Sequence, residues 1–123
     1  MATILAIDDM RSMRELVKSV LEKRGHTVVT HDDGRTALDF AQDNNVDLVI
    51  SDINMPHLDG ISLVDELRKL PGYSSIPILM LTTEDAQQKK DLARAAGANG
   101  WIQKPFNPQR LVNAVDKTLS RYD

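Results

Sequence analysis

The chain has 123 residues, 41% of them hydrophobic and 27% charged, with a net charge of −3, which fits one soluble domain around a single core. The absence of cysteine excludes disulfides and thiolate metal sites, and the mild acidity argues against a nucleic-acid binder, which needs a basic patch. No apolar run is long enough to cross a bilayer and the acidic start differs from a signal peptide, so we expect a cytoplasmic protein without membrane insertion.

Apolar runs and amphipathic stretches alternate along the first half of the chain. TILAI, residues 3–7, is a short β-prone run, and residues 10–25 place apolar side chains on one helical stripe that we expect to end at Gly25. TVVTH, residues 27–31, predicts a second strand, and residues 35–44 predict a second helix. The pattern so far is strand, helix, strand, helix.

The second half of the chain continues the alternation. Further strands are predicted at residues 46–51, 76–81 and 100–103. Further helices are predicted at residues 61–70, over about a dozen residues ending at Gly97, and from Pro108 onward with Asn107 as its N-cap.

Strand and helix therefore alternate five times, and several strands are continuous apolar runs. Such runs are typical of a parallel sheet whose two faces are both covered by helices. We predict a (βα)5 α/β sandwich with right-handed crossovers. Ligands of such folds bind at the carboxyl ends of the strands, near the point where the strand order reverses.

Polar side chains end four of the five predicted strands. They are Asp8–Asp9, Asp52, Thr82–Thr83 and Lys104. Taken singly, each has an ordinary explanation as a helix cap, a turn former or a solvated lysine. Capping does not explain why the acids end strands that we expect to be neighbours, so we predict that these groups converge at one edge of the sheet.

The predicted cluster has an excess of negative charge. Three carboxylates against one lysine leave about two uncompensated charges, so one acid must be neutralised or a cation bound. The available ligands are oxygens, which favours Mg²⁺ over Ca²⁺ at a site with few carboxylates. Aspartate can also attack phosphorus and form an aspartyl phosphate, a reaction that uses a metal ion and a nearby cation. Asp52, Mg²⁺ and Lys104 would supply these parts.

With these residues in view, the chain resembles the receiver domains of two-component response regulators over essentially its whole length. The matching motifs are the acidic pair, DG-x-x-AL at 33–38, D-x-N-M-P-x-x-D-G at 52–60, the strand end at Thr82 and K-P-F at 104–106. The resemblance implies a flavodoxin-like sheet in the strand order 2-1-3-4-5 and a single receiver domain over residues 1–123 without an output domain. Asn54, Glu84 and the run from Asp8 to Arg14 are most similar to the stand-alone, CheY-type chemotaxis subfamily.

The resemblance also implies the metal ligands. Asp52 would be the phosphoacceptor and a Mg²⁺ ligand, and Asp9 would bind the ion directly. Asp8 would act mainly through water, and Asn54 through its backbone carbonyl. The Met-Pro-His-Leu-Asp-Gly turn that follows Asn54 would shape the loop that places this carbonyl.

The resemblance further implies which residues contact the phosphoryl group and which move when it is bound. Lys104 would pair with the phosphoryl group, the Thr82 hydroxyl would move to hydrogen-bond it, and the Lys104–Pro105 peptide would be cis. Trp101 occupies the position of the family's switch aromatic, commonly Tyr or Phe. Its larger indole would swing inward incompletely or in another geometry, unless it only covers the edge of the sheet.

The residues flanking the phosphoacceptor would set access and lifetime. Thr83 stands where the family often has a smaller residue and is expected to narrow access for the donor or the hydrolytic water. Asn54 and Glu84 match the chemotaxis type and imply a short-lived phosphoryl group.

We therefore predict a switch protein rather than an enzyme. This protein would take a phosphoryl group from a histidine kinase, and it would also phosphorylate itself from small donors and dephosphorylate itself. Phosphorylation would remodel the surface formed by the helix ending at Gly97, the strand at 100–103 and the helix from Pro108. The expected partners are a chemotaxis kinase, an output protein such as the flagellar motor switch, and a phosphatase or phosphotransfer protein. We expect a monomer.

Three alternatives remain at this point. A phosphorelay shuttle would hand the phosphoryl group to a histidine phosphotransfer protein. A flavodoxin-like electron carrier needs a Ser/Thr/Gly-rich phosphate loop after the first strand, where this chain has the acidic DDMRS. A phosphatase of the haloacid dehalogenase type needs D-x-D after the first strand and a cap domain, whereas here D-x-N follows the third strand.

Overall fold

A computed structural model describes residues 1–55, 57–83 and 87–122 of the chain, and the structural statements below refer to these residues. Strands and helices alternate in the order β1 (Thr3–Ile7), α1 (Arg11–Glu22), β2 (Thr27–His31), α2 (Gly34–Asp43), β3 (Leu48–Asp52), α3 (Gly60–Arg68), β4 (Ile78–Thr82), α4 (Gln87–Ala96), β5 (Gly100–Gln103) and α5 (Pro108–Tyr122). The strands form a parallel sheet in the order β2-β1-β3-β4-β5. The predicted flavodoxin-like (βα)5 fold is confirmed.

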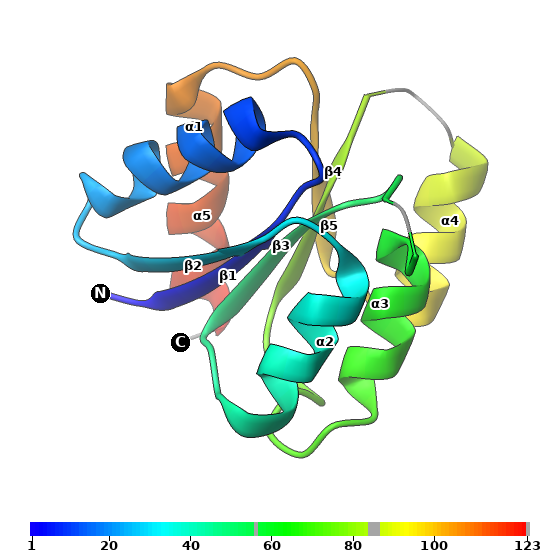
Figure 1. The fold of residues 1–123 in the computed structure, drawn as a ribbon. Helices are drawn as coiled ribbons and strands as arrows, with labels where there is room; N and C mark the ends of the chain where they lie inside the picture. The colour runs from blue at the N-terminus through cyan, green and yellow to red at the C-terminus, as the bar shows by residue number, and fades with distance from the viewer. Residues whose placement is uncertain (56, 84–86, 123) are drawn as a thin grey trace.

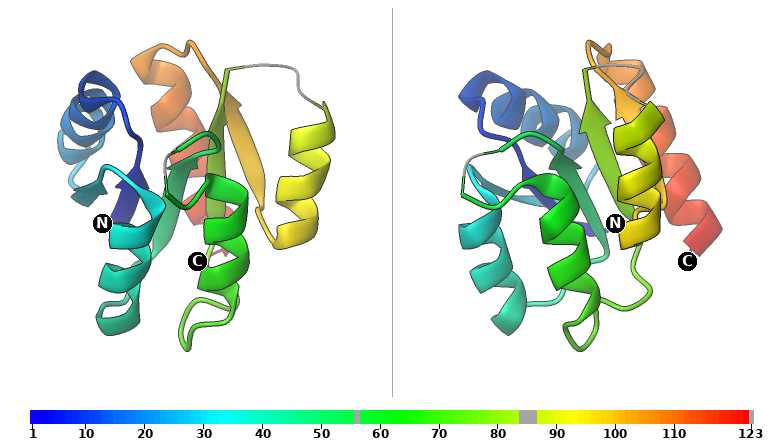
Figure 2. Two further views of the ribbon diagram at one scale, coloured as in Figure 1. Left: turned by 45° about the vertical axis from the view of Figure 1, so that its right-hand side comes forward. Right: turned by 90° about the vertical axis from the view of Figure 1, so that its right-hand side faces the viewer.

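The helices cover both faces of the sheet. Helices α1 and α5 lie against one face, and α2, α3 and α4 lie side by side against the other (Figure 1, Figure 2). Along β1, Ile4 and Ala6 pack into the core under α1 and α5, whereas Leu5 and Ile7 pack into the core under α2, α3 and α4. Because successive strand side chains point to opposite faces, a continuous apolar run is what a doubly covered strand requires.

Three predicted element boundaries were wrong by two residues. Helix α1 ends at Glu22, and Gly25 stops it as predicted: the Gly25 and His26 amides bond back to the carbonyls of Glu22 and Leu21. Gly25 has a φ of 92°, the left-handed conformation that follows many helices. Strands β3 and β4 begin at Leu48 and Ile78 rather than at residues 46 and 76, and α3 ends at Arg68 rather than at residue 70.

Side-chain caps set the start of helices α2 and α3. The Asp59 carboxylate accepts the Ser62 amide and begins α3 at Gly60, and the Asp33 carboxylate accepts the Thr36 amide ahead of α2. The Gly60 amide in turn donates to the Ile53 carbonyl at 2.8 Å. The loop between β3 and α3 is thereby closed on itself, next to the last residue of β3.

None of the described helices is long and apolar enough to span a membrane.

Arg68, at the end of α3, binds carbonyl groups of two connections at the amino edge of the sheet. Its guanidinium donates to the carbonyl oxygens of Gly97 at 2.6 Å, Tyr73 at 2.9 Å and Ile76 at 2.6 Å. Gly97 follows α4, and the other two residues precede β4. One side chain therefore anchors the carboxyl end of α4 to α3.

Arg68→Met is expected to lower the free energy of unfolding by about 2–4 kcal/mol, because several carbonyls lose a charged donor. Guanidinium unfolding would measure the loss. Arg110→Met, at an exposed position in the first turn of α5, serves as the matched control and should change stability by no more than about 0.5 kcal/mol. Equal stability of the two variants would contradict the anchoring role.

Candidate functional site

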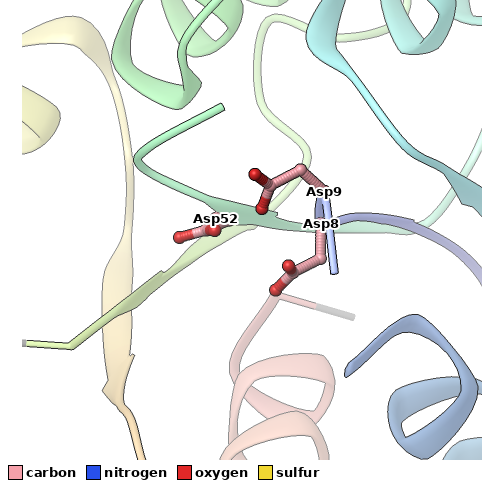
Figure 3. Close-up of side chains that lie close together, drawn as sticks. All are labelled: Asp8, Asp9 and Asp52. Carbon is pink, nitrogen blue, oxygen red and sulfur yellow. The ribbon is translucent and has the colours of Figure 1, made fainter. Parts of the chain in front are cut away.

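Three carboxylates meet at the carboxyl edge of the sheet, as predicted. Asp8 and Asp9 follow β1, and Asp52 ends β3, the strand paired with β1. Each offers one oxygen, and these oxygens all lie within 4.8 Å of one another (Figure 3). Asp8 and Asp52 are buried, with 2% and 7% of their surface exposed, whereas Asp9 is exposed. The cluster is therefore open to solvent on the side of Asp9.

Lys104 brings one positive charge to the cluster. Its Nζ lies 2.8 Å from Asp8 Oδ2 and 3.4 Å from Asp52 Oδ2, and the side chain is buried. The other oxygen of Asp8 accepts the Met10 amide at 2.9 Å. Asp8 is thus the better satisfied of the two buried acids, and the ammonium sits between it and Asp52. The Lys104–Pro105 peptide that follows is cis, in agreement with the expectation.

The environment of Asp52 disfavours its charged form. Burial raises the pKa of this carboxyl above its ordinary 3.8, and the negative charge of Asp8 raises it further. The Lys104 ammonium and the backbone N–H of Asn54 both lower the pKa. The net direction is upward. Without a further cation, the folded protein holds a proton on Asp52 more tightly than the unfolded chain does.

Asp52→Asn is therefore expected to melt a few degrees higher than the wild type at neutral pH in a metal chelator. The stability that the wild type owes to the protonated carboxyl is fully present below the ordinary pKa and is lost as the pH rises through the raised pKa. The gap between the two proteins should close on acidification toward pH 3.8, the ordinary value. Thermal melts over this pH range would show it, and a variant less stable than the wild type at neutral pH would contradict it.

The donor set fits a hard divalent cation. Three carboxylates face a single ammonium, and all candidate ligand atoms are oxygens, the set that Mg²⁺ prefers. Asp8, already bonded to Lys104 and to the Met10 amide, is less available as a direct ligand than the exposed Asp9. Asn54 follows Asp52 closely on the same loop, and its side chain is exposed.

The remaining predicted residues surround this cluster. Thr82 ends β4 and is buried, and its carbonyl accepts the Lys104 amide at 2.6 Å. Thr83 is exposed directly beyond the strand. Glu84 lies outside the described residues.

Trp101 lies on β5, at the edge of the sheet, and is half-buried under α4. The Lys90 Nζ and the Arg94 Cζ lie 5.1 Å and 4.9 Å from the centroid of its ring. Both cations come from α4, one turn apart, so the indole joins this helix to the edge strand.

Three basic side chains of α4 have defined contacts, although Lys89 and Arg94 are exposed. Lys90 and Arg94 face Trp101, and the Lys89 Nζ lies 2.7 Å from Asn54 Oδ1. The only sequence signal was the spacing of four between two basic residues on the helix that precedes the edge strand.

Comparisons with known proteins agree with this geometry. The family model described as the response regulator receiver domain matches residues 4–116. The chemotaxis protein CheY of Pseudomonas aeruginosa is 36% identical over 119 residues, which is 96% of each chain. The chemotaxis protein CheY-3 of Vibrio cholerae is 37% identical over 96% of this chain and 92% of its own.

Solved structures give the same result. The chemotaxis response regulator CheY4 of Vibrio cholerae matches with a TM-score of 0.92 and 44% identity, covering 96% of this chain and 98% of the other. The receiver domain of the sensor histidine kinase PA1611 from Pseudomonas aeruginosa matches with a TM-score of 0.89 and 26% identity, covering 97% and 98% of the two chains. That structure has a magnesium ion coordinated in its active-site cleft.

Proposed function

Because the chain belongs to the response regulator receiver domain family, we propose that Asp52 accepts a phosphoryl group from a histidine kinase and that Asp9, Asp52 and the Asn54 carbonyl hold a Mg²⁺ ion. The observation that carries the proposal is the cluster of three carboxylates with a buried lysine at the carboxyl edge of the sheet. The likeness to chemotaxis proteins over nearly the whole chain makes it a response regulator of the chemotaxis type.

In the proposed transfer, a carboxylate oxygen of Asp52 attacks the phosphorus of a phosphohistidine or a small acyl phosphate. The new O–P bond forms as the bond to the leaving nitrogen or oxygen breaks, and the leaving group keeps the electron pair. Bound Mg²⁺ would supply positive charge to the phosphoryl oxygens. Asp8 would act on the ion mainly through water.

Lys104 then exchanges partners. Its ammonium already lies 3.4 Å from Asp52 Oδ2, so a short movement away from Asp8 brings it to a phosphoryl oxygen. The Thr82 hydroxyl, at the end of the neighbouring strand, is the second donor of the proposed site. Hydrolysis of the acyl phosphate would return the protein to its resting state, with Asn54, Thr83 and Glu84 setting access and lifetime.

The output would leave through the surface of α4, β5 and α5. Movement of Thr82 toward the phosphoryl group opens space beside β4 for Trp101, and a shift of this ring changes its contacts with Lys90 and Arg94 on α4. The flagellar motor switch is the partner that we propose for this surface. The protein would act in the cytoplasm as a monomer and as a single receiver domain over residues 1–123.

The alternatives are less well supported. The relatives named for chemotaxis do not favour a phosphorelay shuttle. The receiver family match, together with the acidic cluster where a flavin phosphate would sit, speaks against the electron carrier and the dehalogenase-type phosphatase.

The test is an intact-mass measurement of the wild-type protein with acetyl phosphate, in Mg²⁺ and in excess chelator. We expect one added phosphoryl group in Mg²⁺, lost again on standing as inorganic phosphate, and none in chelator. No adduct with either acetyl phosphate or a phosphorylated chemotaxis kinase would contradict the proposed function. A phosphoryl group that is stable to water but passes readily to a histidine phosphotransfer protein would instead favour the shuttle.

A further inference from the structure

Lys89 links α4 to the rim of the phosphorylation site. It stands in the first turn of α4, and its Nζ lies 2.7 Å from Asn54 Oδ1, although the two residues are 35 positions apart in the chain. The backbone N–H of Asn54 also stabilises the charged form of the Asp52 carboxylate and lowers its pKa. One exposed ammonium is thus connected to the phosphoacceptor through a single intervening residue.

The orientation of Lys89 differs from that of its neighbour in the helix. The Lys90 ammonium lies over the Trp101 ring, whereas Lys89 extends toward α3 and the loop after β3. There it borders an open groove of about 290 Å³, which is also lined by Ile53, Asn54, Asp59, Ile61, Ser62 and Leu92. Asp59 is the one other charged residue among the described residues of this lining, and its carboxylate is engaged by the Ser62 amide at 2.9 Å. The groove includes Ile53 and Asn54, the two residues that follow Asp52 in the chain.

The charge of Lys89 is not cancelled by the residue that holds it. The Asn54 amide is neutral, whereas the ammonium of Lys69, at the far end of α3, lies 2.9 Å from Glu66 and 3.5 Å from Asp65. The other lysine of the site, Lys104, is buried against Asp8. The half-buried Arg14 guanidinium donates to the Asp8 carbonyl at 2.8 Å, whereas Lys89 is an exposed positive charge that the described structure holds beside Asn54.

An anionic donor approaching Asp52 meets three carboxylates and one buried ammonium. A positive charge at the entrance raises the local concentration of an anion and its rate of encounter, by about tenfold or more in favourable sites, and salt screens the effect.

We propose that Lys89 is a specificity-determining residue of the phosphorylation site, held at the rim by Asn54, where it draws anionic phosphodonors toward Asp52. The inference rests on the proposed function and adds to it a residue outside the strand ends. Lys89 favours donors with a free, dianionic phosphoryl group and acts on their capture rather than on the chemistry at phosphorus.

The experiment compares the rate at which acetyl phosphate phosphorylates four proteins in Mg²⁺, followed by intact mass at low and at high ionic strength. The proteins are the wild type, Lys89→Gln, Lys89→Arg and Lys69→Gln. Glutamine can still donate to Asn54 but has no charge, and arginine keeps both properties. Lys69→Gln makes the same change in net charge at the opposite edge of the sheet.

At low ionic strength Lys89→Gln should react about three- to tenfold more slowly than the wild type, and the deficit should shrink at high ionic strength. Lys89→Arg and Lys69→Gln should stay within about twofold of the wild type. An unchanged rate for Lys89→Gln, a salt-independent deficit or an arginine variant as slow as glutamine would overturn the inference while the wild-type adduct still supports the proposed function. Absence of the adduct in all four proteins, with acetyl phosphate and with a phosphorylated kinase, would overturn both.

Discussion

Asp52→Asn should form no phosphoryl adduct at all, with acetyl phosphate or with a phosphorylated kinase. The amide that replaces the carboxylate is nearly the same size but is a far weaker nucleophile toward phosphorus. Its site is buried beside Asp8 and Lys104, so the substitution changes charge rather than packing. Intact mass would show the loss, and peptide mapping of the wild type would place the adduct on the peptide that contains Asp52.

Asp59→Asn is the matched control for this loss. Asp59 lies on the same loop, is exposed and caps α3 by accepting the Ser62 amide, which asparagine does equally well. The control should keep the adduct. Phosphorylation of Asp52→Asn at another carboxylate, with the exposed Asp9 as the obvious candidate, would show that the acceptor has been assigned to the wrong strand end.

Gly60→Ala is expected to cost about 3 kcal/mol or more of stability and to slow phosphorylation. A Cβ at this position would collide with the Asp52 carbonyl oxygen and lie 2.9 Å from both Ile53 Cα and Met80 Cε. Two of these atoms are backbone, so relief requires the end of β3 to move. The residue that moves with it is the phosphoacceptor itself, because the Gly60 amide and the Ile53 carbonyl close the loop beside Asp52.

Gly100→Ala tests whether the cost is particular to this contact. Gly100 also lies in a regular element, but its added Cβ would come only within 3.4 Å of the flexible end of Leu79. Chemical unfolding should show at most about 1 kcal/mol of change for this control, since a side-chain tip can rotate away. If Gly60→Ala unfolds at the same denaturant concentration as the wild type, the close approach of α3 to β3 does not constrain the site.

The fold could be predicted because its elements carry strong local signals. Continuous apolar runs such as residues 3–7 predict strands covered on both faces, and a polar residue such as Asp52 at the end of a run marks the carboxyl edge. Parallel pairing brings these ends together without any knowledge of side-chain contacts. The acidic cluster followed from that topology and from the excess of negative charge.

The contacts of α4 could not be predicted in the same way. Lys89, Lys90 and Arg94 stand in the stretch QQKKDLARAA, whose mostly polar and alanine composition is common in solvated helices. Which of them meets Asn54 and which meets Trp101 depends on how the helix is rotated and where it is anchored. The anchor is Arg68, whose bond to Gly97 joins positions 29 apart and has no local signature.

The single tryptophan of the chain lies where α4 meets β5, with two cations over its ring. Indole emission shifts with the charge and polarity around the excited ring, and here no second indole dilutes the signal. The intrinsic fluorescence of the unlabelled protein therefore reports changes in the contact between α4 and β5. Stopped-flow traces of that emission would time the motion of this surface separately from the chemistry at Asp52, without a dye or an engineered probe.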